Sequence, residues 1–96
     1  MARMPVYAVT YTYVAEPERL ASVRAEHRAY LRGLHADGAV LASGPLPDDG
    51  GALLLLSARD LAGLEQLLLA DPFAVHGLIS TTDVRRWEPV IGPWAS

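Results

Sequence analysis

The order in which strand-type and helix-type segments alternate constrains the fold of this chain more than any other feature. Residues 6–13 alternate between two faces, as a β-strand does, and a helical pattern over about residues 17–35 follows them. Residues 39–43 and 52–57 are then predicted as two strands joined by a hairpin turn at residues 48–51. A second helix from Asp60 to about Ala70, a helical turn within residues 73–78 and a last strand over residues 79–87 complete the pattern.

This βαββαβ order predicts an α+β fold of the ferredoxin-like kind, with a four-stranded antiparallel sheet and two helices on one face. Residues 52–57 are apolar on both faces, which favours a central strand. Residues 79–87 are polar and are followed by Pro89, which favours an edge strand. We expect Gly44-Pro45 to close the strand before it reaches the hairpin turn.

Composition limits the classes of protein to which the chain can belong. Its 96 residues suit one domain over residues 1–96, and the net charge of -3 with scattered arginines argues against nucleic-acid binding. The absence of cysteine excludes disulfides, thiolate nucleophiles and sulfur-ligated metals. The longest apolar run, residues 52–56, is far too short for a membrane span, and the first residues do not form a signal peptide. We therefore expect a cytoplasmic protein.

His27 lies on the apolar stripe of the first helix, and Asp71 stands between the second helix and Pro72. A histidine can transfer protons near neutral pH if a carboxylate fixes its tautomer, so Asp71 is a candidate partner. The spacing of the two residues does not show that they meet. A core histidine bonded to a backbone carbonyl is the alternative, and the more frequent one.

Several pieces of the sequence together resemble the YciI-like, or YCII-related, family. They are the first strand, the helix segment Arg24-Ala25-Glu26-His27-Arg28-Ala29-Tyr30-Leu31, Gly38 with Leu41-Ala42-Ser43-Gly44-Pro45-Leu46, and Ala70-Asp71-Pro72-Phe73. The resemblance implies a dimeric α+β barrel with a catalytic His27 and Asp71 pair, and cofactor-independent chemistry on small ring compounds such as dehalogenation. Family members often carry a proline two or three residues before the histidine, where this chain has Arg24 and Ala25.

Ser43-Gly44-Pro45 forms a second candidate site, because glycine lets a ligand approach the backbone and Ser43 offers a hydroxyl. A turn that ends a strand, without any role in binding, explains these residues equally well. Arg28 lies beside the apolar stripe and is a candidate contact for a carboxylate or phenolate, although helical arginines more often lie in solvent, and Arg32 is a weaker candidate. Phe73, in the motif of Asp71, is the remaining candidate for ligand binding.

The other histidines and the aromatic residues favour structural roles. His35 suits the C-terminal end of its helix, and His76 suits the surface. No histidine spacing points to a metal site, so we expect none, and no cofactor. The tyrosines of the first strand and Tyr30 favour a packed core and dimer interface over an aromatic-lined cavity.

A sheet with one uncovered apolar face predicts a homodimer, and the tail with Trp87 and Trp94 is expected to cross onto the partner.

Two functions remain open at this point. In the first, His27 oriented by Asp71 transfers a proton on a small aromatic or lactone-like substrate without a cofactor. In the second, the same pocket belongs to a dimeric ligand-binding or accessory module without turnover. A close contact of His27 and Asp71 inside a pocket favours the first, whereas a tightly packed His27 without a pocket removes the site.

Overall fold

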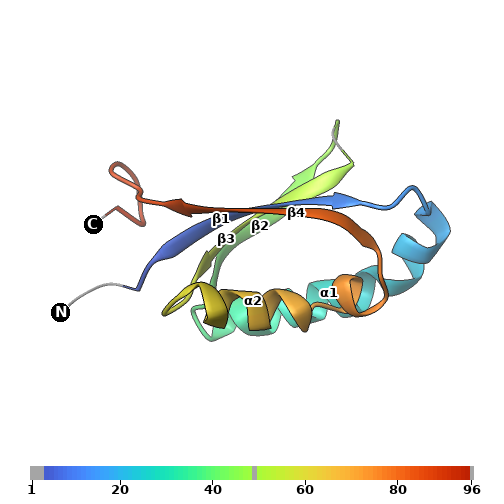
Figure 1. Ribbon diagram of the computed structural model, residues 1–96, viewed down its shortest axis with the longest axis horizontal. Coiled ribbons are helices and arrows are strands. Elements are labelled where there is room, and N and C mark those ends of the chain that lie inside the picture. The colour runs from blue at the N-terminus through green and yellow to red at the C-terminus, as the bar shows by residue number, and fades with distance from the viewer. Residues whose placement is uncertain (1–3, 49, 96) are drawn as a thin grey trace.

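The computed structural model describes residues 4–48 and 50–95. Within these residues, four strands and three helices follow one another (Figure 1). They are β1 (Val6–Tyr13), α1 (Pro17–Ala36), β2 (Val40–Leu46), β3 (Gly51–Ser57), α2 (Leu61–Leu69), α3 (Pro72–Val75) and β4 (Ile79–Trp87).

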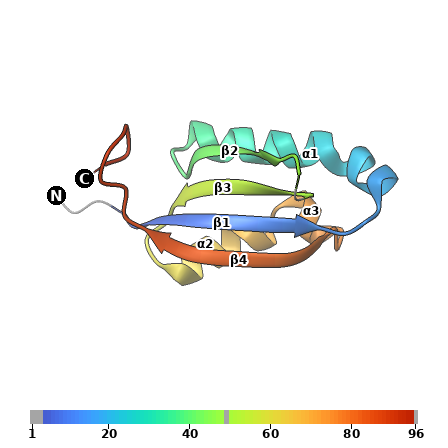
Figure 2. The same cartoon turned by 90° about the horizontal axis from the view of Figure 1, so that it is seen from above.

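The strands form one antiparallel sheet in the order β2-β3-β1-β4, and the helices lie together on one of its faces (Figures 1 and 2). This arrangement confirms the predicted ferredoxin-like fold. β3 lies between two other strands and β4 lies at an edge, as the hydrophobic patterns of these segments predict. Pro89, which follows the edge strand, removes no hydrogen bond from the sheet because it lies beyond the end of β4.

The main core lies between the sheet and the helices. Val9 and Leu54, which are paired neighbours on β1 and β3, and Leu64 of α2 are completely inaccessible to solvent. A second buried cluster joins the start of α1 to the region around α3 and consists of Leu20, Val23, Phe73 and Leu78. His27 follows Val23 by one helical turn, so the apolar face of α1 carries the imidazole into the interior beside this cluster.

The prediction that Gly44-Pro45 closes the second strand is wrong. β2 continues to Leu46, with Gly44 opposite Leu53 and Pro45 opposite Ala52. Proline has no N–H to donate, but β2 is an edge strand with a neighbour on one side only, so a proline is tolerated there. The turn beyond it includes Asp49, which lies outside the described residues, and Gly50, whose positive φ of 64° suits the predicted glycine turn.

Local capping places Asp71 where the chain changes direction. The Asp60 side chain accepts a hydrogen bond from Gly63 N and caps α2, as predicted. Asp71 then adopts an extended backbone conformation, as expected before a proline, and Pro72 begins the single turn of α3. The helical turn predicted within residues 73–78 thus exists, and begins at Pro72.

The sheet face away from the helices is not covered by other elements of this chain (Figure 1). Its central part includes Leu53, which is 38% exposed, and the half-buried Leu55 opposite Ala8. In the tail, Val90 and Ile91 are exposed whereas Pro89 is buried. Within the described part of the chain, no helix is both long and apolar enough to cross a bilayer.

Candidate active site

His27 and Asp71 meet in the interior of the fold although 44 residues separate them in sequence. His27 Nδ1 lies 2.7 Å from Asp71 Oδ1, and the two side chains are 8% and 1% exposed. α1 supplies the histidine from its buried face, and the turn between α2 and α3 supplies the aspartate. His27 is therefore bonded to a carboxylate and not to a backbone carbonyl, which was the alternative.

The carboxylate of Asp71 is held by donors on both oxygens. Phe73 N–H donates to Oδ1 at 3.0 Å, which caps α3, and the Tyr11 hydroxyl donates to Oδ2 at 3.2 Å. A carboxylate accepts hydrogen bonds and does not donate them, so in the short contact with Oδ1 the proton lies on His27 Nδ1. A neutral His27 then carries its lone pair on Nε2.

The imidazole is fixed in orientation by stacking as well. Its ring lies parallel to that of Phe73, with centroids 4.1 Å apart and planes 14° apart. Phe73 is itself buried and contacts Tyr13 edge to face at 5.2 Å. Nε2 has no hydrogen-bond partner within residues 4–48 and 50–95. Every fully buried polar side-chain atom of these residues does have a partner, so Nε2 is not fully buried. Nε2 is therefore accessible from the pocket that His27 lines.

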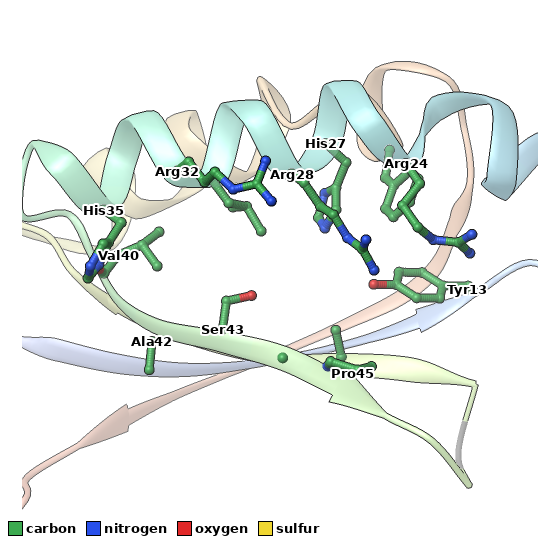
Figure 3. Close-up of a pocket in the computed structure, with 14 residues that line it drawn as sticks. Tyr13, Arg24, His27, Arg28, Arg32, His35, Val40, Ala42, Ser43 and Pro45 are labelled. Carbon is green, nitrogen blue, oxygen red and sulfur yellow. The ribbon is translucent and has the colours of Figure 1, made fainter.

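This pocket lies between α1 and β2 and has a volume of about 490 Å³ (Figure 3). That volume is within the usual range for sites that bind small molecules. Its wall is formed by Tyr13, Arg24, His27, Arg28, Leu31, Arg32, His35, Val40, Ala42, Ser43, Gly44, Pro45, Ala52 and Phe73.

The second candidate site lies on the wall opposite His27. Ser43 is opposite Leu54 in the sheet register and shares its face, so the hydroxyl points toward α1 (Figure 3). Pro45 lies two residues further on the same face, and Gly44 between them turns its Cα away from the helices. A Cβ at Gly44 would meet no atom within 4 Å, so the strand itself does not require glycine there. The structure thus brings Ser43, Gly44 and Pro45 to the pocket that His27 lines, whereas Asp71 is buried and bonds to His27 without lining the pocket.

The remaining candidates also border the pocket, in different ways. Arg28 is exposed and extends from α1 toward β2 (Figure 3). Phe73 is only 1% exposed and mainly supports the imidazole by stacking on it. His35 reaches the far end of the pocket, where Nδ1 donates to the Val40 carbonyl at 2.8 Å and helps to close the end of α1. His76 is an exposed residue outside the pocket.

The buried tyrosines are held in the neutral form. The pKa of Tyr11 is raised far above its ordinary value, first by burial and then by the negative charge and hydrogen bond of Asp71. The pKa of Tyr13 is raised by burial and by Asp71, although the positive charges of Arg24 and Arg28 act in the opposite direction. Tyr11 is therefore a stable hydrogen-bond donor to the carboxylate.

Tyr11 is the residue of the site that the sequence pattern does not reveal. Its alternation with Tyr7 and Val9 on one face of β1 predicts a core residue, and it is buried, at 1% exposed. Which of the tyrosines donates to Asp71 depends on where α3 crosses the end of the sheet. Tyr13, which the sequence pattern places in the core or the dimer interface, packs against the core and also lines the pocket.

Among the described residues, no three His, Cys, Asp or Glu side chains are grouped closely enough to hold a metal ion.

The chain matches the YCII-related domain over residues 4–88. It belongs to the YCII-related family. No curated protein matches the chain significantly.

Solved structures of other proteins share the fold, among them the following three. One is 5-chloro-2-hydroxyhydroquinone dehydrochlorinase (TftG) from Burkholderia phenoliruptrix in complex with 2,5-dihydroxybenzoquinone, with a TM-score of 0.77 and 24% identity over 86% of this chain and 93% of that chain. A putative antibiotic biosynthesis monooxygenase from Bacteroides thetaiotaomicron has a TM-score of 0.63 and 14% identity, covering 98% and 96% of the two chains. A Pseudomonas aeruginosa protein has a TM-score of 0.59 and 17% identity, covering 95% and 98%. At these identities the likeness concerns the fold alone.

Proposed function

We propose that this YCII-related protein is a cofactor-independent enzyme in which His27, oriented by Asp71, transfers a proton on a small aromatic or lactone-like substrate. The observation that carries the proposal is the 2.7 Å contact between His27 Nδ1 and Asp71 Oδ1 at the wall of a ligand-sized pocket. A buried pair of this kind without a pocket would favour a structural role. Here the second imidazole nitrogen is accessible, which is what a general base requires.

The proposed reaction begins with a proton on an acidic O–H or C–H of the bound ring. His27 Nε2 accepts this proton, and the bond that held it leaves its electron pair on the ring. The imidazolium that forms is stabilised by Asp71, whose other oxygen is neutralised in part by the Tyr11 hydroxyl. The electron pair then either takes a proton back at another atom, which is an isomerisation, or expels an anionic leaving group, which is an elimination.

The fold relative TftG supports the choice of substrate class. It is a dehydrochlorinase of a chlorinated hydroxyhydroquinone, and its structure contains a dihydroxybenzoquinone. Loss of hydrogen chloride from such a ring needs proton removal and departure of chloride, which are the steps open to a histidine base. We therefore propose hydroxylated rings as the first substrates to test.

The test uses purified protein without added cofactor and a panel of chlorinated hydroxyquinols and unsaturated lactones. Product formation and uptake of solvent deuterium are followed by NMR. We expect the substitution His27→Gln to lower the rate on any accepted substrate by about 10²-fold or more, which is the usual contribution of a general base. His76→Gln is the matched control, because His76 is exposed and outside the pocket, and it should leave the rate unchanged.

Full activity of the His27→Gln variant would contradict the proposal. If pocket ligands bind to the protein but no compound of the panel turns over or exchanges deuterium, the chain is better described by the alternative function, a ligand-binding or accessory module.

The proposal extends to the assembly. We propose that residues 1–96 form one YCII-related domain, that two copies pair through the uncovered sheet face, and that the dimer works in the cytoplasm. The exposed Leu53 and the half-buried Leu55 support the pairing, since apolar side chains at the centre of a sheet face are stabilised by burial. That the tail with Trp87 and Trp94 crosses onto the partner stays a prediction.

A further inference from the structure

The wall of the His27 pocket is positively charged in a chain whose net charge is negative. One of the chain's eight arginines, Arg3, lies outside the described residues, and three of the other seven line this pocket, namely Arg24, Arg28 and Arg32. Among residues 4–48 and 50–95 no aspartate or glutamate lines the pocket, and the nearby Asp71 is already bonded to His27, Tyr11 and Phe73. The pocket thus gathers positive charge although the chain has eleven acidic residues.

The three arginines form one row on α1, because they follow each other at intervals of four residues. Figure 3 shows their side chains on the pocket side of the helix, with Arg28 extending between His27 and Tyr13. Within the described residues none of the three forms an ion pair, whereas Arg19 pairs with Glu16 and Arg85 with Asp83. Three guanidinium groups beside one cavity therefore have free donors.

The rest of the pocket fits a flat apolar body. Leu31, Val40, Ala52 and Phe73 line it, and its volume of about 490 Å³ greatly exceeds that of an inorganic anion. A guanidinium group donates two parallel hydrogen bonds, a geometry that matches a carboxylate. The pocket thus offers apolar contacts to a ring and paired donors to an acidic group.

We propose that the pocket recognises small ring compounds that carry a carboxylate, which Arg28 and Arg24 bind while the ring lies against His27. Arg32, which is exposed, adds positive charge to the same wall of the pocket. This inference rests on the proposed function, because it names the class of compound on which His27 acts. It assigns the arginines to recognition and gives them no part in proton transfer.

The test compares two probes of similar size and shape, 2,5-dihydroxybenzoate, which carries a charged carboxylate, and 2,5-dihydroxybenzamide, which carries a neutral amide in its place. Binding is measured by calorimetry and by chemical-shift changes at the backbone amides of Ser43 and Gly44. We expect the carboxylate to bind at least about tenfold more tightly than the amide, because charge-assisted hydrogen bonds are the stronger ones. Its affinity should fall with added salt, since the arginines are partly exposed.

The substitutions Arg28→Gln and Arg24→Gln should each weaken carboxylate binding by about tenfold and leave amide binding unchanged. Arg59→Gln is the control, because Arg59 is exposed and outside the pocket. Circular dichroism melting curves check that the variants are folded. Equal affinity for the two probes, no binding of the carboxylate, displacement of it by an equal concentration of inorganic phosphate, or unchanged affinity in both variants would each overturn the inference.

Binding and turnover separate the two proposals. If 2,5-dihydroxybenzoate binds through the arginines but His27→Gln does not change any rate, the recognition inference stands and the proposed proton transfer fails. If neutral rings turn over through His27 at rates that the arginine variants do not alter, the proposed function stands and this inference fails.

Discussion

At the scale of single residues, the site is organised around one buried carboxylate. Asp71 is 1% exposed, and three donors from three different parts of the chain surround it, namely α1, β1 and the start of α3. A buried charge is tolerated where hydrogen bonds replace the lost water. Removing one donor should therefore disturb both the stability of the fold and the orientation of His27.

The substitution Tyr11→Phe tests the contribution of one donor at neutral pH. It keeps the ring but leaves Asp71 Oδ2 without the hydroxyl, so we expect the free energy of unfolding to fall by about 1–3 kcal/mol. Urea denaturation followed by circular dichroism measures the change. A loss below about 0.5 kcal/mol would mean that water replaces the hydroxyl at little cost.

Measurements at alkaline pH test the same contact through the titration of Tyr11. The folded-state pKa of Tyr11 is raised above its value in the unfolded chain, so folding favours the protonated phenol. This contribution is fully present below about pH 10 and is lost as the pH rises further, because the unfolded chain then releases a proton that the folded chain keeps.

Stability measured in steps above about pH 9.5 should fall more steeply in the parent protein than in Tyr11→Phe. Tyr13 and Tyr30, whose pKa values burial also raises, leave a residual slope in the variant. Identical slopes for the two proteins would contradict the assigned role of Tyr11.

At the scale of elements, the close contact of β1 and β3 determines where Tyr11 lies. Gly51 begins β3 opposite Thr12, and a Cβ at Gly51 would overlap the carbonyl oxygen of Tyr11. Only glycine allows the two strands to approach this closely at their present register. Gly51 thus affects the position of Tyr11 although it is not among the residues that line the pocket.

Gly51→Ala should separate the strands and lower the free energy of unfolding by about 1–3 kcal/mol, the usual range for a steric clash in a packed interior. Gly33→Ala is the matched control, because the added methyl group, in the last turn of α1, would have no atom within 4 Å apart from its chain neighbours and the backbone of its own helix. There we expect a gain of up to about 1 kcal/mol, since alanine favours helix more than glycine does. Equal effects of the two substitutions in thermal denaturation would contradict the role given to Gly51.

Most of the helices and strands are predictable from sequence, and the exception is the extent of β2. The alternation in β1, the apolar stripe of α1, the cap Asp60 and the helix end before Pro72 are local signals, and each corresponds to a feature of the structure. The extension of β2 through Pro45 depends on β2 being an edge strand, which sequence pattern does not state. The contact of His27 with Asp71 is of the same kind, since it depends on how α3 packs on α1.

At the scale of the whole molecule, the layers leave one sheet face to be covered. Thr10 and Leu53 are neighbours on this face, and so are Ala8 and Leu55. We expect light scattering after gel filtration to show a dimer, and Leu53→Lys with Leu55→Lys to shift it toward monomer, because charges at the centre of an interface are costly to bury. Ser22→Lys, on the exposed side of α1, should leave the mass unchanged. A monomer for the parent protein at micromolar concentration would contradict the proposed assembly.

The central claim is that Asp71 holds the Nδ1 proton of His27 and so leaves Nε2 as the base facing the pocket. Nitrogen-15 NMR of the imidazole measures this directly in the parent protein and in Asp71→Asn, at a pH where the ring is neutral. In the parent protein we predict a protonated Nδ1 and an unprotonated Nε2. In Asp71→Asn we predict loss of this preference, because the side-chain amide can donate as well as accept. A parent protein with the proton on Nε2, or the same tautomer in both proteins, would contradict the claim.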